Sequence, residues 1–127
     1  MSGIVGETGS KSGIVSPSWI SLSSYLQTHF TQASSTNYPV RYNKVGELVN
    51  LDGYVAKAAT DNTTILSGIP TEIRPISPII AYQQCRYDGT VNRGVVVYIH
   101  YNGNIGYAHS GGGYAASWIP LNCIYSV

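Results

Sequence analysis

Short runs of alternating apolar and polar residues, separated by Gly, Pro and Asn, fill most of the chain after residue 18. In the clearest run, residues 95–101, one face carries Val95, Val97, Ile99 and Tyr101 and the other carries Val96, Tyr98 and His100. This period of two predicts a β-strand, and apolar residues on both faces predict a central one. Further strands are expected at 40–44, 47–55, 63–66, 79–85, 105–107 and 118–127. About eight short strands without a convincing helix predict a sandwich or barrel, and we expect an all-β, antiparallel, jelly-roll-like β-sandwich over residues 19–127.

The Gly, Pro and Asn residues between these runs also predict local structure. Gly53 interrupts an apolar run and indicates a bulge or a close backbone approach. Three prolines exclude a central strand or a helix interior from residues 67–78. Within that segment, Arg74 is expected to cap carbonyl groups or to pair with Glu72 or Asp52. Asn102-Gly103-Asn104 predicts a hairpin turn.

Two segments near the start of the domain are less regular. Residues 31–37 are small and polar and predict a loop. The apolar residues of 19–30 fit one face of a helix as well as the start of a strand. They are Trp19, Leu22, Leu26 and Phe30.

The first eighteen residues form an extended arm in this interpretation. Ser-Gly-Ile-Val occurs at 2–5 and again at 12–15, in a stretch rich in Gly, Ser and Thr. Such a segment has too few apolar groups to repay the entropy of ordering, roughly 1–2 kcal/mol per residue for the backbone. We expect it to anchor on a partner; the alternative is a flexible terminus pinned by its own domain or a lattice contact. The expected anchor residues are Ile4, Val5, Ile14, Val15 and Trp19.

The composition favours an assembly protein. Charged residues make up 10% of the chain, against roughly 25% in ordinary soluble domains. The net charge is +1 without a basic run, so no nucleic-acid partner is expected. Eleven Tyr against one Phe suit surfaces that pack with rings yet offer hydroxyl groups. A homo-oligomer is therefore expected.

The chain shows no signs of membrane insertion or secretion. No run approaches the roughly 18–20 apolar residues of a membrane span, and Met1 is followed by Ser and Gly rather than a charged patch and an apolar stretch. We expect folding in a cytoplasm, with Cys85 and Cys123 as free thiols. Their spacing does not match a metal site, so neither a metal nor a cofactor is expected.

Catalytic signatures are missing from the sequence as well. His29, His100 and His109 have no carboxylate at a suggestive spacing, and no Gly-x-Ser-x-Gly elbow occurs. Residues 111–113 are three glycines without the Gly-Lys-Ser/Thr of a phosphate loop. We expect no catalytic residues and no enzyme.

The residues around this glycine loop offer a candidate glycan site. Saccharide sites use aromatic faces and uncharged hydrogen-bonding groups. The candidates are Tyr107, His109, Tyr114 and Trp118. The alternative for these side chains is ordinary packing in the core or at a subunit interface.

Several segments resemble, in order, the small β-sandwich modules of bacteriophage virions, found in tail fibres, baseplate adhesins and head-surface proteins. Residues 38–53 resemble their paired strands ending in apolar-x-apolar-x-Gly, and residues 69–75 resemble their Leu-Pro-x-x-Tyr-Arg-Pro turn. Residues 102–105 and 118–122 are similar to their closing hairpin and final strand, and the arm to the start of many short virion proteins of aquatic phages. The resemblance implies a strand plus a turn for residues 19–30.

This resemblance implies a virion protein that folds in the host cytoplasm and ends on the virion surface. The first expectation is a capsid decoration (cement) protein, a homotrimer whose arm docks on the major capsid protein and stabilises the shell. The alternative is a tail-fibre or tail-tip receptor-binding module that recognises host surface glycan. The resembling tail adhesins usually end longer chains with a stalk, whereas this chain has a short arm at its own Met1. That difference favours the decoration protein.

Overall fold

In this computed structural model the described residues are 17–58, 63–87, 91–109 and 118–127, with the backbone alone described at 84–87, 91–93 and 109. Ile4, Val5, Ile14 and Val15 of the expected arm therefore lie outside the described residues, as does Tyr114.

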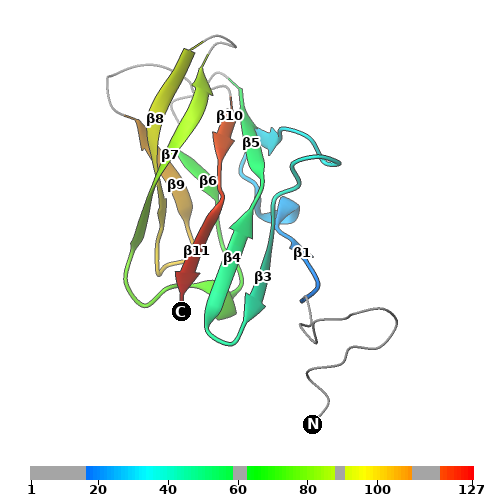
Figure 1. Ribbon diagram of the computed structural model, residues 1–127, viewed down its shortest axis with the longest axis vertical. Coiled ribbons are helices and arrows are strands. Elements are labelled where there is room, and N and C mark those ends of the chain that lie inside the picture. Colours follow the sequence, from blue (N-terminus) through cyan, green and yellow to red (C-terminus); the bar gives the residue numbers. More distant parts are fainter. Residues whose placement is uncertain (1–16, 59–62, 88–90, 110–117) are drawn as a thin grey trace, which may run out of the picture.

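The described chain is built from antiparallel strands in two sheets (Figure 1). The four-stranded sheet has the order β1 (Ile20–Ser21), β3 (Arg41–Val45), β4 (Leu48–Asp52) and β11 (Cys123–Ser126). The seven-stranded sheet has the order β2 (Phe30–Gln32), β5 (Tyr54–Lys57), β10 (Trp118–Pro120), β7 (Ile79–Tyr87), β8 (Val91–Ile99), β9 (Ile105–His109) and β6 (Thr64–Leu66). The all-β, antiparallel prediction is confirmed.

Helical structure in the described ranges is limited to two short 3-10 turns, η1 (Ser23–Tyr25) and η2 (Thr71–Ile73). None of the described segments is a helix of the length and apolarity needed to span a bilayer. Residues 19–30 form β1, η1 and β2, so the strand-plus-turn prediction is confirmed and the helical alternative is wrong. The predicted loop at 31–37 begins later, because Thr31 and Gln32 pair with β5.

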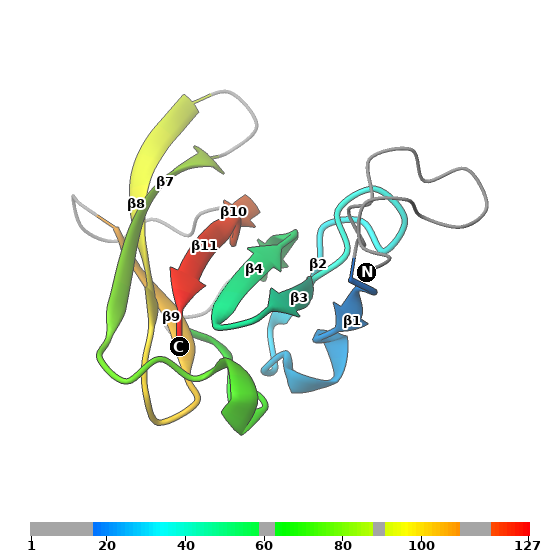
Figure 2. The same ribbon diagram turned by 60° about the horizontal axis from the view of Figure 1, so that its bottom comes forward.

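One hydrophobic core takes side chains from both sheets. Tyr42, Val49 and Leu51 reach it from the four-stranded sheet, and Val97 and Ile119 from the seven-stranded sheet. Figure 2 shows β3, β4 and β11 to one side of β7, β8 and β9. Strand β8 lies between β7 and β9, which confirms the prediction that it is central.

A continuous two-stranded ribbon joins the sheets at a corner. Strand β4 passes into β5 through Gly53, and the antiparallel β10 passes into β11 through Leu121 and Asn122 (Figure 1). The Leu121 amide donates to the Gly53 carbonyl at 2.8 Å, and the Gly53 amide donates to Asn122 Oδ1 at 3.0 Å. Gly53 has a φ of +119°, and a Cβ there would lie 2.7 Å from the Val40 Cα. The predicted close approach is confirmed.

The proline-rich segment 67–78 bridges the two sheets instead of joining one. Within it Ile73 is fully buried, and its carbonyl accepts a hydrogen bond from the Tyr125 hydroxyl of β11 at 2.7 Å. On the other side, the Ile69 amide donates to the Gly103 carbonyl in the β8–β9 hairpin at 3.2 Å. Arg74 Nε donates to the Ile69 carbonyl at 2.9 Å, so the carbonyl-capping prediction for Arg74 is confirmed.

The predicted hairpin turn at Asn102-Gly103-Asn104 is also confirmed. Gly103 has a φ of +95°, a conformation that glycine adopts without steric cost. Strand β8 ends at Ile99, so Tyr101, expected on the strand, lies exposed in the turn.

Candidate functional site

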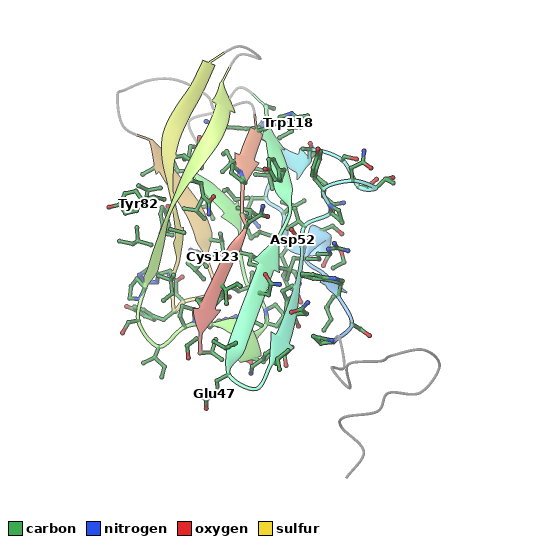
Figure 3. All side chains as sticks on the ribbon, in the orientation of Figure 1. Glu47, Asp52, Tyr82, Trp118 and Cys123 are labelled. Carbon is green, nitrogen blue, oxygen red and sulfur yellow. The ribbon has the colours of Figure 1, made fainter. Side chains whose placement is uncertain are left out.

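Three aromatic side chains gather on the outward face of β5 and β10, where Figure 3 labels Trp118. The Tyr38 ring lies 4.9 Å from the Tyr54 ring and 5.9 Å from the Trp118 ring, centroid to centroid. Tyr54 and Trp118 are 6.4 Å apart and nearly perpendicular, at 81°. These are the separations and tilts that aromatic pairs prefer. We call Tyr38, Tyr54 and Trp118 the aromatic cluster.

Strand alternation explains why the aromatic cluster faces outward. Val55 and Ile119, the neighbours of Tyr54 and Trp118 along their strands, are fully buried in the core. Because successive side chains point to opposite faces of a sheet, Tyr54 and Trp118 lie on the other face. The two strands pair with Tyr54 opposite Pro120 and Trp118 opposite Ala56, so the rings are diagonal neighbours.

The loop that carries Tyr38 is fastened to the backbone of Tyr54. The Ala33 amide donates to the Tyr54 carbonyl at 2.9 Å, and the Tyr54 amide donates to the Tyr38 carbonyl at 3.3 Å. Inside the loop the Tyr38 amide donates to the Ser34 carbonyl at 3.0 Å. The Asn37 amide donates to Ser34 Oγ, also at 3.0 Å. These bonds hold the Tyr38 backbone beside Tyr54.

Trp19 packs on the four-stranded sheet. The Arg41 guanidinium carbon lies 4.3 Å from the centroid of the Trp19 ring, and Arg41 Nε lies 2.9 Å from Asp52 Oδ2. Arg41 and Asp52 are opposite each other on β3 and β4, with Asp52 labelled in Figure 3. Asp52 thus pairs with Arg41 and not with Arg74. Trp19, expected among the anchor residues, contacts its own domain in this arrangement.

The outward face of β7, β8 and β9 is uncharged at the residues whose side chains are described. Tyr82 is 84% exposed and Ile80 is 60% exposed, and Figure 3 shows Tyr82 projecting away from the sheet. The strand register places Ile80 beside Tyr98, whose ring lies over Gly106. We call this surface the β7–β9 face. Its members are Ile80, Tyr82, Val96, Tyr98, Gly106 and Ala108.

A smaller apolar surface lies on the four-stranded sheet. Val45 and Leu48 pair at the β3–β4 turn, and Ile124 lies diagonally across from Leu48 on β11. All three side chains are exposed.

The two expected glycan residues whose side chains are described, Tyr107 and Trp118, lie on opposite faces of the seven-stranded sheet. Tyr107 is 1% exposed, packs edge-on to Phe30 at 6.3 Å and has Lys57 Nζ 5.1 Å from its ring centroid. Tyr107 therefore belongs to the hydrophobic core, because β9 turns this ring inward. The His109 side chain lies outside the described residues. Trp118 is on the surface, but with Tyr38 and Tyr54, which sequence reasoning missed because they are distant along the chain.

Burial raises the pKa of two tyrosine hydroxyl groups and of one thiol. The pKa of Tyr42 is raised to about 12, mainly by burial and secondly by the hydrogen bond that its hydroxyl donates to Glu72 Oε1. Burial also raises the pKa of Tyr125 and of the free Cys123 thiol above their ordinary values. A thiol with a raised pKa is a poor nucleophile at neutral pH. No group of three metal-ligating side chains occurs within the described ranges.

Comparison of the chain with family models, curated proteins and solved structures finds no match.

Proposed function

We propose that this protein is a bacteriophage virion structural protein, a capsid decoration (cement) protein. Residues 19–127 form its antiparallel, jelly-roll-like β-sandwich, and residues 1–18 form an arm that docks on the major capsid protein. The observation that supports this assignment best is the exposure of large apolar side chains on the outward faces of both sheets, at Ile80 and Tyr82 and again at Leu48 and Ile124.

Such surfaces are typical of proteins that work in assemblies. Contiguous exposed apolar patches are small on monomeric soluble proteins, and larger ones mark contact sites. Interface centres are also depleted in charged residues and enriched in Tyr. The β7–β9 face has both properties, with Tyr82 and Tyr98 and no charged member. It supports a homo-oligomer, and the resemblance to virion modules makes that oligomer a trimer.

The arm supplies the proposed link to the capsid. Ile4, Val5, Ile14 and Val15 fill apolar recesses between capsid subunits, and each side chain contributes roughly 1.5–3 kcal/mol if fully buried. A protein that binds the assembled lattice and not free subunits stabilises the shell by mass action. The ordering of the arm offsets part of this energy.

The decisive experiment replaces Ile4 and Ile14 by Ser and measures decoration and heat stability of virions. We expect lower occupancy on the particle and genome release at a lower temperature, because the apolar contacts of the arm are lost. Ser10→Ala in the same arm is the matched control and leaves both measurements unchanged.

The opposite pattern favours the other candidate. If heat release of the genome is unchanged and adsorption to host cells is lost, the decoration proposal is overturned. The protein is then a tail-fibre or tail-tip receptor-binding module.

A further inference from the structure

We infer that the aromatic cluster of Tyr38, Tyr54 and Trp118 is a binding surface for a neutral saccharide. This function goes beyond capsid docking, which the arm performs in the proposal above. It involves residues that contribute little to the core, since Tyr38 is 41% exposed and the other two rings are half-buried.

The geometry of the cluster is prepared before any ligand binds. The three rings contact one another pairwise, and Tyr54 holds the Tyr38 loop through both its amide and its carbonyl. A fixed arrangement of this kind lowers the entropy lost on binding. The hydrogen bonds inside the loop, from the Asn37 amide and the Tyr38 amide to Ser34, add to this rigidity.

The loop that carries Tyr38 offers groups that suit an uncharged ligand. Residues 31–40 and 53–56, which carry Tyr38 and Tyr54, contain no charged side chain, while Arg86 of β7 is the strand partner opposite Trp118. The Tyr38 loop instead exposes the hydroxyl and amide side chains of Ser35, Thr36 and Asn37. Sugar rings present C–H groups that pack on aromatic faces, and their hydroxyl groups bond to uncharged donors and acceptors. Residues 31–40 themselves offer no counter-charge to an ionic ligand.

The test is a titration of the purified full-length protein with three neutral oligosaccharides: cellohexaose, mannohexaose and the hexamer of N-acetylglucosamine. Polygalacturonate serves as the anionic comparison. We expect at least one neutral oligosaccharide to bind more tightly than polygalacturonate and to shift the Trp118 indole signal in the NMR spectrum. Tyr54→Ala and Trp118→Ala should each weaken binding about tenfold or more, the usual loss when a central aromatic contact is truncated.

Tyr82→Ala is the matched control, because it removes an equally large exposed ring from the β7–β9 face and should leave saccharide affinity unchanged. Tyr38→Ala is the second variant, because Tyr38 lies on a surface loop where truncation does not disturb strand pairing. It should weaken binding while the thermal unfolding of the protein stays the same.

Two results would overturn the inference. One is that none of the neutral oligosaccharides binds at about 10 mM, a concentration above the Kd of even a weak specific complex. The other is a Tyr38→Ala variant that changes the oligomeric state and not saccharide affinity, which would assign the cluster to subunit packing. Because the isolated protein is used, neither result depends on whether the arm docks on a capsid.

Discussion

Gly53 is the residue on which the corner between the sheets depends. Alanine at this position meets the backbone of Pro39 and Val40 and also adopts an unfavourable φ of +119°. We expect Gly53→Ala to lower the free energy of unfolding by about 3 kcal/mol or more, measured by urea unfolding.

Gly46 separates the effect of the backbone clash from the effect of the unfavourable φ. It also has a positive φ, +59°, but a Cβ there meets nothing within 4 Å. Gly46→Ala should therefore cost only the conformational strain, about 1–2 kcal/mol. Equal losses for the two variants would show that the close approach at Gly53 contributes nothing.

Tyr42 makes stability depend on alkaline pH. Its folded-state pKa of about 12 lies above the ordinary value of 10.0, so the folded protein holds this proton more tightly than the unfolded chain. The resulting stability is fully present below pH 10 and is lost as the pH rises toward 12. Burial shifts Tyr125 in the same direction.

Tyr42→Phe tests this linkage by urea unfolding at a series of pH values. We expect a loss of about 1 kcal/mol at neutral pH, where the hydrogen bond to Glu72 is removed, and a shallower decline above pH 10. Tyr101→Phe, in the exposed turn, is the control. An alkaline decline as steep in Tyr42→Phe as in the parent protein would rule out the role of Tyr42.

At the scale of elements, the segment 67–78 holds the two sheets together without pairing as a strand. Arg74 is central to it, since its Nε donates to the Ile69 carbonyl and its Cζ lies 2.9 Å from the position that a Cβ on Gly103 would take. Arg74→Ala leaves that carbonyl without its charged donor. We expect a loss of about 1–3 kcal/mol in thermal unfolding experiments.

Arg41→Ala is the comparison at the same scale, because the Arg41–Asp52 pair is about one-third exposed and screened by solvent. Its cost should stay below about 1 kcal/mol. A larger loss in Arg41→Ala than in Arg74→Ala would contradict the bridging role of the segment.

For the whole molecule, the uncharged β7–β9 face predicts self-association. We expect the protein to sediment as a trimer at micromolar concentration and Ile80→Lys to sediment as a folded monomer, because a buried unpaired charge is costly. Thr71→Lys, at another exposed position, should leave the trimer intact. A parent protein that sediments as a monomer would refute the trimer in solution.

Much of the strand pattern could be predicted because it rests on local chemistry. Period-two alternation located β8, turn residues located the β8–β9 hairpin, and prolines excluded a strand from 67–78. Gly53 was predicted as a point of close approach since only glycine tolerates one. These signals act over a few residues and are fully present in the sequence.

The candidate site could not be predicted in the same way. Tyr107 and Trp118 lie on either side of the three glycines 111–113 in the sequence, yet one ring is in the core and the other is on the surface. The face to which each ring points is set by strand register, and the pairing of β5 with β10 brings Tyr54 to Trp118. Strand pairing joins residues distant along the chain through backbone hydrogen bonds that every sequence possesses. For that reason the sequence alone determined where the strands and turns lie, and only the tertiary structure decided which tyrosines meet on the surface.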